Sequence, residues 1–320
     1  MMKYYIGIDL GGTNIATGVV DENYHIVGTG KRKTKQQATS VEIIEDMAAA
    51  AKDAVKDAGL SMSDISGCGV GSPGSIDTKN GLVCYSNNID VNLLPMRDMI
   101  EERLNVPTYI ANDANAAALG EMLCGAGKGT NSFVTITLGT GVGSGVIMDN
   151  NILVGDNCAG GELGHTVLVY DGEQCTCGRK GCWEAYASAS ALIRQTKAKM
   201  EDNKDSLMWK IAKESGGKVT GRTAFDAMRA GDKSGKEVVD QYINYVAAGI
   251  TNVVNIFQPE VLCIGGGISK EGETLLKPIR EFVERERYSK NIEKQTEIKA
   301  ATLGNDAGII GAAFLHTLFE

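Results

Sequence analysis

The chain has 320 residues, of which 43% are hydrophobic and 22% charged, and its formal net charge is −8. This length exceeds what one hydrophobic core usually supports, so we expect two lobes. The negative charge argues against nucleic acid as the main partner, and no apolar run is long enough for a membrane span. No signal peptide precedes the strand-like run that begins at Tyr4, so we expect a cytoplasmic protein.

Strand-like runs and glycine turns alternate through the first third of the chain. We expect Thr39 and Glu42 to form a capping box that begins a helix ending near Gly59. A second helix, rich in small residues, is expected to begin at Asp113. The strands predicted in this part cover residues 4–10, 14–20, 24–30, 65–71 and 106–111.

The opening pattern of strand, glycine turn and strand returns in the middle of the chain. Strands predicted over 133–138 and 142–148 flank the turn Gly139-Thr140-Gly141, which corresponds to the turn Gly11-Gly12-Thr13 near the N-terminus. Two similar halves predict a duplicated α/β fold with a cleft between its lobes. The next elements predicted are a helical stretch from 183 to about 259, a strand over 261–264 followed by Gly265-Gly266-Gly267, and a terminal helix from about 305 to the end. The charged stretches 197–218 and 281–299 are expected to be solvent-exposed helix faces.

One histidine and three cysteines lie close together in the sequence, at His165, Cys175, Cys177 and Cys182. Three thiols and one imidazole are a complete tetrahedral ligand set for zinc, and four protein ligands leave no position open for water. We therefore expect a structural zinc. The alternative is a Cys175–Cys182 disulfide, but a reducing cytosol favours metal binding.

The glycine turns and two acidic residues are candidates for nucleotide chemistry. Successive glycine amides can cradle phosphate oxygens, and three such turns fit one nucleotide. Asp9 beside the first turn is either a turn residue or a partner for Mg²⁺. Asn112-Asp113 stands between a strand and a helix, where it is either an N-cap or a general base. The run Gly69-x-Gly71-x-x-Gly74 matches a dinucleotide fingerprint by letters, but Pro73 lies inside it and no helix is expected to follow.

Together these segments resemble the ROK (repressor, open reading frame, kinase) family of sugar kinases and, within it, the bacterial glucokinases. The resemblance covers nearly the whole chain. It rests on Asp9-Leu-Gly-Gly-Thr-Asn14, Gly71-Ser-Pro-Gly-Ser75, Asn112-Asp113-Ala-Asn115, Leu138-Gly-Thr-Gly141, Glu162-Leu-Gly-His165 and Cys175-x-Cys177-Gly-x-x-Gly-Cys182-x-Glu184.

The resemblance implies an actin-like (ribonuclease H-like) α/β fold with two lobes and a zinc-binding loop. We place the small lobe at 1–112 plus 305–320 and the larger lobe at 113–304. The implied reaction is ATP-dependent phosphorylation of a hexose at its 6-hydroxyl, with Asp113 as the base. The residues implied to hold the sugar are Gly74, Asn112, Asp113, Glu162, His165 and Glu184. Those expected to bind zinc are His165, Cys175, Cys177 and Cys182. Those expected to bind ATP and Mg²⁺ are Asp9, Gly11, Gly12, Thr13, Asn14, Gly139, Thr140, Gly141, Gly265, Gly266 and Gly267.

Several functions share parts of this pattern. Glucose is the expected substrate, but a ROK kinase for N-acetylmannosamine, fructose or allose would carry the same motifs. A sugar-binding regulator would bind hexose without ATP turnover, and an actin-like or chaperone-like ATPase would not need the zinc loop. Repressors of the family carry a helix-turn-helix before the first strand, for which a strand at Tyr4 leaves no room. The resemblance also implies a homo-oligomer, either a dimer or a tetramer.

Overall fold

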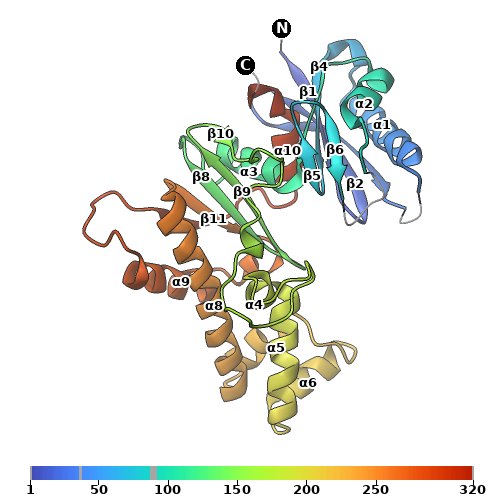
Figure 1. Ribbon diagram of the computed structural model, residues 1–320. Helices are drawn as coiled ribbons and strands as arrows, with labels where there is room; N and C mark the ends of the chain where they lie inside the picture. Colours follow the sequence, from blue (N-terminus) through green and yellow to red (C-terminus); the bar gives the residue numbers. More distant parts are fainter. Residues whose placement is uncertain (1, 36–37, 87–91, 319–320) are drawn as a thin grey trace. The chain divides into compact units, whose positions relative to one another are not determined.

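The computed structural model describes residues 2–35, 38–86 and 92–318, which form two compact units. Unit 1 consists of Met1–Thr135, Gly145–Gly161 and Ala301–Glu320, and unit 2 of Ile136–Ser144 and Glu162–Ala300. Each unit contains strands and helices, which confirms the predicted α/β class (Figure 1). None of the helices within the described ranges has the length and apolar character needed to span a membrane.

Unit 1 is built on a five-stranded sheet of order β3-β2-β1-β4-β7. The strands β1, β4 and β7 run parallel, whereas β2 is antiparallel to both of its neighbours. The strands of this unit are β1 (Tyr4–Leu10), β2 (Asn14–Asp21), β3 (Ile26–Lys33), β4 (Ile65–Ser72), β5 (Ser75–Asp77), β6 (Leu82–Tyr85), β7 (Thr108–Asn112) and β10 (Asn151–Ile152). Its helices are α1 (Ser40–Asp57), α2 (Met96–Leu104), α3 (Asp113–Cys124) and α10 (Asp306–Ala313), with 3-10 turns η1 (Met62–Asp64) and η4 (Leu315–Leu318).

The two faces of β1 are covered by different helices. Ile6, Ile8 and Leu10 are fully buried in the cluster that contains the apolar face of α1. The alternate residues face α10, because a Cβ on Gly7 would lie 1.9 Å from the carbonyl oxygen of Ile309. The glycine lets α10 approach the sheet closely and brings its first turn next to Asp9.

Helix α3 packs directly on α10, backbone against backbone. A Cβ on Gly311 would lie 1.7 Å from the carbonyl oxygen of Ala116, so this crossing requires glycine. Near the other end of α3, the buried carboxylate of Glu121 accepts hydrogen bonds from the backbone N–H groups of Thr302 and Leu303 at 2.9 and 2.8 Å. It also accepts one from the N–H of Ala126 at 2.9 Å. These bonds join α3 to the segment that enters α10, and they satisfy a buried charge that would otherwise be costly.

The second sheet has the order β10-β9-β8-β11-β12, and its strands β8 and β9 each run from one unit into the other. Its remaining strands are β8 (Phe133–Leu138), β9 (Val142–Met148), β11 (Val261–Gly265) and β12 (Glu297–Ala300). The helices of unit 2 are α4 (Glu184–Ala187), α5 (Ala189–Asp202), α6 (Leu207–Glu214), α7 (Thr223–Arg229), α8 (Lys233–Phe257) and α9 (Glu273–Glu286), with 3-10 turns η2 (Leu163–His165) and η3 (Gly267–Glu271).

Most elements lie where the sequence predicts them, and the capping box between Thr39 and Glu42 is confirmed. The helix predicted over 281–299 is wrong beyond Glu286, because 297–300 is a strand that pairs in parallel with β11. The terminal helix ends at Ala313 and is followed by η4, so its predicted extent to the end of the chain is not observed over the described residues.

The two compact units divide the chain differently from the lobes expected from the motifs. Residues 113–135 belong to unit 1, because α3 packs along α10 and against β4 and β7. The lobe boundary at 112/113 stays a prediction.

Candidate functional site

The carboxyl ends of three parallel strands lie at one edge of the unit 1 sheet. The register pairs Asp9 of β1 with Gly71 of β4, and Ser72 of β4 with Asn112 of β7. Residues that follow these strands therefore gather at this edge, which is where α/β sheets usually bind ligands. Asp9 and Asn112, near the carboxyl ends of β1 and β7, lie at this edge, and Asp113 directly follows β7.

Asn112 begins α3 and also connects it to Gly74. Its side-chain oxygen accepts hydrogen bonds from the N–H groups of Ala114 and Asn115, at 2.9 and 3.3 Å, so the N-cap interpretation is confirmed. Its amide nitrogen donates to the carbonyl oxygen of Gly74 at 3.0 Å. Gly74 has φ +108°, and a Cβ there would lie 2.1 Å from the carbonyl oxygen of Tyr85. The turn after β4 thus requires glycine.

Asp9 and Asp113 form a buried pair of acids at this edge. Although both residues keep some exposed surface, their carboxylates are largely surrounded by protein. Burial, reinforced by the nearby charge of Asp113, raises the pKa of Asp9 to about 6. Burial also raises the pKa of Asp113, an effect that the hydrogen bond from the N–H of Ala114 at 2.9 Å partly offsets. Such a pair can hold a divalent cation or accept a proton near neutral pH.

Replacing Asp9 by Asn is expected to stabilise the protein in the absence of Mg²⁺ and nucleotide. The folded pKa of about 6 lies above the ordinary value of 3.8, so folding favours the protonated acid. The wild type should lose stability as the pH rises from 4 to above 6, whereas the variant has no such proton to lose. A difference of two pKa units corresponds to about 3 kcal/mol in the free energy of unfolding. Urea unfolding of both proteins at pH 7.5 and pH 4 would measure the gap, which should close at the lower pH.

Asp21, at the end of β2, is a control whose substitution should change the stability of the protein in the opposite direction. Burial favours its protonated form, but hydrogen bonds from the backbone N–H groups of His25 and Asn23, both 2.9 Å, outweigh burial and lower its pKa. Asp21→Asn should therefore destabilise the protein at pH 7.5, and the loss should shrink as the pH falls below the ordinary carboxyl range. Equal effects of both substitutions would contradict the assigned environment of Asp9.

The predicted zinc ligands come together in unit 2. The ligand atoms of His165, Cys175, Cys177 and Cys182 all lie within 4.8 Å of one another. The sulfurs of Cys177 and Cys182 are 3.6 Å apart, and the Cys175 sulfur is 3.7 Å from Nδ1 of His165. Zinc–sulfur bonds of about 2.3 Å at tetrahedral angles place neighbouring ligand atoms about 3.8 Å apart. The donor set and its spacing fit zinc, and all eight cysteines are free, so the disulfide alternative is not observed.

Tight turns in the cysteine segment set this spacing. The N–H of Cys175 donates to the carbonyl oxygen of Arg179 at 2.8 Å, and Gly178 between them has φ +89°. Gly181 has φ +79°, and a Cβ there would lie 1.7 Å from the carbonyl oxygen of Val169. The pattern C-x-C-x4-C therefore folds back on itself only because glycine occupies both positions.

Glu184 connects the cysteine segment to the second glycine turn. One carboxylate oxygen accepts a hydrogen bond from the N–H of Val142 at 2.9 Å, directly after the turn Gly139-Thr140-Gly141. The other accepts from the hydroxyl of Thr176 at 3.2 Å. Thr176 was not among the predicted site residues, although its place between two candidate metal ligands was a signal. Glu184 is thereby oriented by two donors of its own unit.

His165 ends the 3-10 turn η2, and Glu162 directly precedes this turn, which also contacts the start of β9. The N–H of Leu163 donates to the hydroxyl of Ser144 at 3.0 Å. A Cβ on Gly164 would lie 2.2 Å from the carbonyl oxygen of Val142, the residue whose N–H binds Glu184. The structure thus brings η2 and Glu184 to the same end of β9.

The three glycine turns take the predicted places after their strands. In unit 1 the N–H of Gly11 donates to the carbonyl oxygen of Asn14 at 2.9 Å, so the turn between β1 and β2 is tight. In unit 2 the N–H of Gly139 donates to the carbonyl oxygen of Gly141 at 3.0 Å. Gly266 follows β11 with φ +85°, and a Cβ there would lie 2.5 Å from the carbonyl oxygen of Leu138. The second and third turns are therefore neighbours.

Comparison with known proteins relates this arrangement to one family. The ROK family model matches residues 5–317. The glucokinase of Halalkalibacterium halodurans is 38% identical over 314 residues, which cover 98% of this chain and 94% of that protein. The structure of a ROK family glucokinase from Streptomyces griseus, in complex with glucose and AMPPNP, superposes with a TM-score of 0.81 and 36% identity over 98% of both chains.

A ROK hexokinase from Thermus thermophilus superposes with a TM-score of 0.80 and 33% identity over the full length of both chains. These structures confirm the predicted actin-like sugar kinase fold, and the family match confirms the resemblance drawn from the motifs. The chain belongs to the ROK family.

Proposed function

We propose that this protein transfers the γ-phosphoryl group of ATP to the 6-hydroxyl of glucose and releases glucose 6-phosphate and ADP. The observation that carries the proposal is the buried acid Asp113, which stands at the start of α3 beside Asn112 in a chain whose relatives include glucokinases. A carboxylate with a raised pKa in this position is suited to accept the proton of an attacking hydroxyl.

In unit 1, Asp113 orients the 6-hydroxyl and accepts its proton as the oxygen attacks phosphorus. The Asn112–Gly74 hydrogen bond holds the adjoining turn in place, so that Gly74 and Asn112 contact the sugar. The protein forms no covalent bond to the phosphoryl group, and correct positioning supplies most of the rate.

In unit 2, Glu162 and Glu184 accept hydrogen bonds from the ring hydroxyls. The two donors that already bind Glu184, the N–H of Val142 and the hydroxyl of Thr176, fix its orientation before the sugar arrives. With Nδ1 of His165 directed at the Cys175 sulfur, the other ring nitrogen is left for the sugar.

The cofactors have separate tasks. His165, Cys175, Cys177 and Cys182 would hold zinc, whose contribution is to fix the loop that carries the sugar ligands. Asp9 would bind Mg²⁺, which supplies positive charge for the phosphate oxygens. The three glycine turns would donate backbone N–H groups to ATP. They consist of residues 11–14 (Gly11, Gly12, Thr13, Asn14), 139–141 (Gly139, Thr140, Gly141) and 265–267 (Gly265, Gly266, Gly267).

The remaining expectations belong to the same proposal. The enzyme works in the cytoplasm as a dimer or tetramer, and its lobes comprise 1–112 plus 305–320 and 113–304.

A panel of hexoses with ATP and Mg²⁺ tests the proposal, with ADP release as the readout. Glucose is expected to give the largest kcat/KM, and N-acetylmannosamine, fructose and allose are the competitors. A larger kcat/KM for one of these would reassign the substrate within the family. ATP hydrolysis that no hexose accelerates would overturn the proposed reaction.

A further inference from the structure

A pocket of about 470 Å³ lies in unit 2 between helix α9 and strand β12. The strand stands at the edge of its sheet and pairs with β11 on one side only. Its lining residues are Arg280, Val283, Glu284, Arg287, Thr296, Glu297, Ile298 and Lys299. None of them belongs to the sites proposed for sugar, ATP or zinc.

Two of the three cations around this pocket are already engaged. Arg280 binds both oxygens of Glu273, at 2.8 and 3.0 Å, and its Nε donates to the carbonyl oxygen of Ile298 at 2.9 Å. Lys299 forms an ion pair with Glu297 at 2.6 Å. Among the residues that the structure describes, no carboxylate forms an ion pair with Arg287, the third cation of the pocket.

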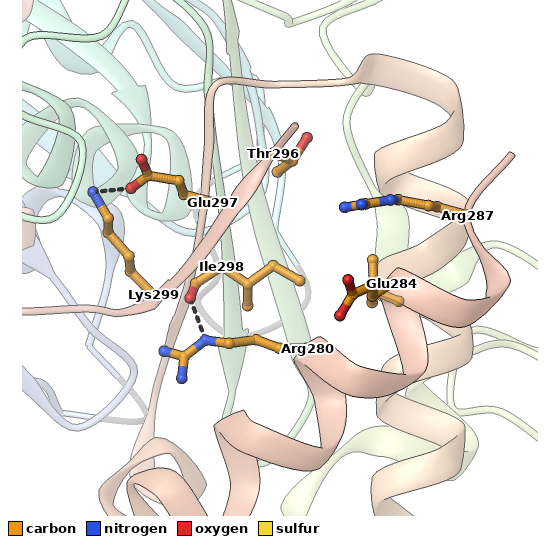
Figure 2. Close-up of a pocket in the computed structure, with 8 residues that line it drawn as sticks. Arg280, Glu284, Arg287, Thr296, Glu297, Ile298 and Lys299 are labelled. Carbon is orange, nitrogen blue, oxygen red and sulfur yellow. Dashed lines mark hydrogen bonds and ion pairs between the residues drawn. The ribbon is translucent and has the colours of Figure 1, made fainter. Parts of the chain in front are cut away.

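Arg287 follows the last residue of α9 and extends toward β12 (Figure 2). Its Nε is buried and has no hydrogen-bond partner within the described chain. A buried N–H without an acceptor is costly, and a ligand oxygen would remove that cost. The planar guanidinium presents paired donors that match the oxygens of a phosphate or carboxylate.

Glu284 lies one helical turn before Arg287, and its carboxylate also points toward the pocket (Figure 2). Over the residues that the structure describes, no ion pair joins Glu284 and Arg287. The pocket therefore offers the N–H donors of Arg287 for an oxyanion and, beside them, the carboxylate of Glu284, which accepts hydrogen bonds. A ligand with a phosphate at one end and hydroxyl groups at the other satisfies both.

We propose that this pocket binds a sugar phosphate, with its phosphate on Arg287 and its hydroxyl groups on Glu284. Its volume is within the range of small-molecule sites. Because Arg280 and Lys299 are already paired, the guanidinium of Arg287 supplies the positive charge that favours an anion over a neutral sugar. The choice of glucose 6-phosphate as the physiological ligand rests on the proposed function, because the proposed reaction produces it. The proposal that the pocket binds a sugar phosphate does not depend on that function.

Calorimetric titration of the full chain tests the pocket. Glucose and a non-hydrolysable ATP analogue are kept saturating, so that the proposed active site is filled. Glucose 6-phosphate is then expected to bind at one site per chain, and Arg287→Met should weaken this binding at least tenfold while turnover without added glucose 6-phosphate is unchanged. Arg285→Met is the matched control, because Arg285 lies only two residues before Arg287, in the last turn of α9, but pairs with Glu286 outside the pocket.

A second variant separates a sugar phosphate from free phosphate. Glu284→Gln should weaken glucose 6-phosphate and leave the weaker binding of inorganic phosphate unchanged. Wild-type affinity in Arg287→Met would overturn the site, and equal affinity for phosphate and glucose 6-phosphate would overturn the sugar phosphate assignment. Titration with glucose alone reports separately on the proposed active site, so the two proposals can fail independently.

Discussion

Replacing Asp113 by Asn is expected to lower the turnover number by a factor on the order of 10² to 10⁴, the usual contribution of a general base. The amide oxygen of Asn can still accept the hydrogen bond from the N–H of Ala114, so α3 should begin at the same residue. The KM for glucose should change little, since the substitution removes a proton acceptor and keeps the shape of the side chain. Steady-state kinetics with glucose, ATP and Mg²⁺ would measure both constants.

Two further measurements make this result specific. Because burial raises the pKa of Asp113, removing its charge should leave the unfolding midpoint at pH 7.5 unchanged or higher, so a slow variant is not an unfolded one. Asp53→Asn, on α1, removes an exposed acid that pairs with Arg32 and should retain full activity. Near-normal turnover in Asp113→Asn would remove Asp113 from the role of base.

Replacing Cys177 by Ala is expected to abolish stoichiometric zinc binding and to raise the KM for glucose at least tenfold. Loss of one of four ligands weakens a structural zinc site strongly, and metal binding here is coupled to the fold of the loop. The loop carries Glu162 and His165 at one end and Glu184 at the other. The sulfur of Cys175 lies 3.7 Å from a Glu184 oxygen, so disorder at the metal should reach the proposed sugar ligands directly.

Elemental analysis of the purified protein and glucose kinetics check this prediction together. Cys124→Ala is the control, since Cys124 is also a free thiol but lies at the end of α3, outside the cluster of four. It should keep one zinc per chain and a normal KM. A Cys177→Ala variant that loses zinc and keeps the wild-type KM would show that the metal does not position the sugar ligands.

Local patterns were sufficient wherever an element depends on its own residues. Strand β1 begins and ends as predicted, because Ile6, Ile8 and Leu10 alternate with residues of the other face. The start of α1 follows from Thr39 and Glu42, which bond to each other's backbone. The metal ligands could be found by spacing, because a short loop can bring them together without help from the rest of the chain.

The same patterns failed where a distant partner decides the conformation. Residues 297–300 alternate charged and apolar side chains, which suits an exposed helix face as well as an edge strand. Pairing with β11, more than thirty residues earlier, makes this segment a strand. Such a partner has no local signature in the sequence.

By itself, the sequence determined the α/β class, the family, most strands and helices, and the cluster of candidate metal ligands, because these depend on side-chain type and short spacing. Tertiary structure decided how burial and distant neighbours shift the pKa values of the candidate site residues and fix the orientation of their side chains. The pKa of Asp9 is raised by burial and, to a smaller extent, by Asp113, far along the chain, and the orientation of Glu184 depends on Val142 and Thr176. The bonds of Glu121 reach Thr302 and Leu303, which lie 181 and 182 residues away. Burial and long-range hydrogen bonding arise only when separated segments pack together, so no local pattern can report them.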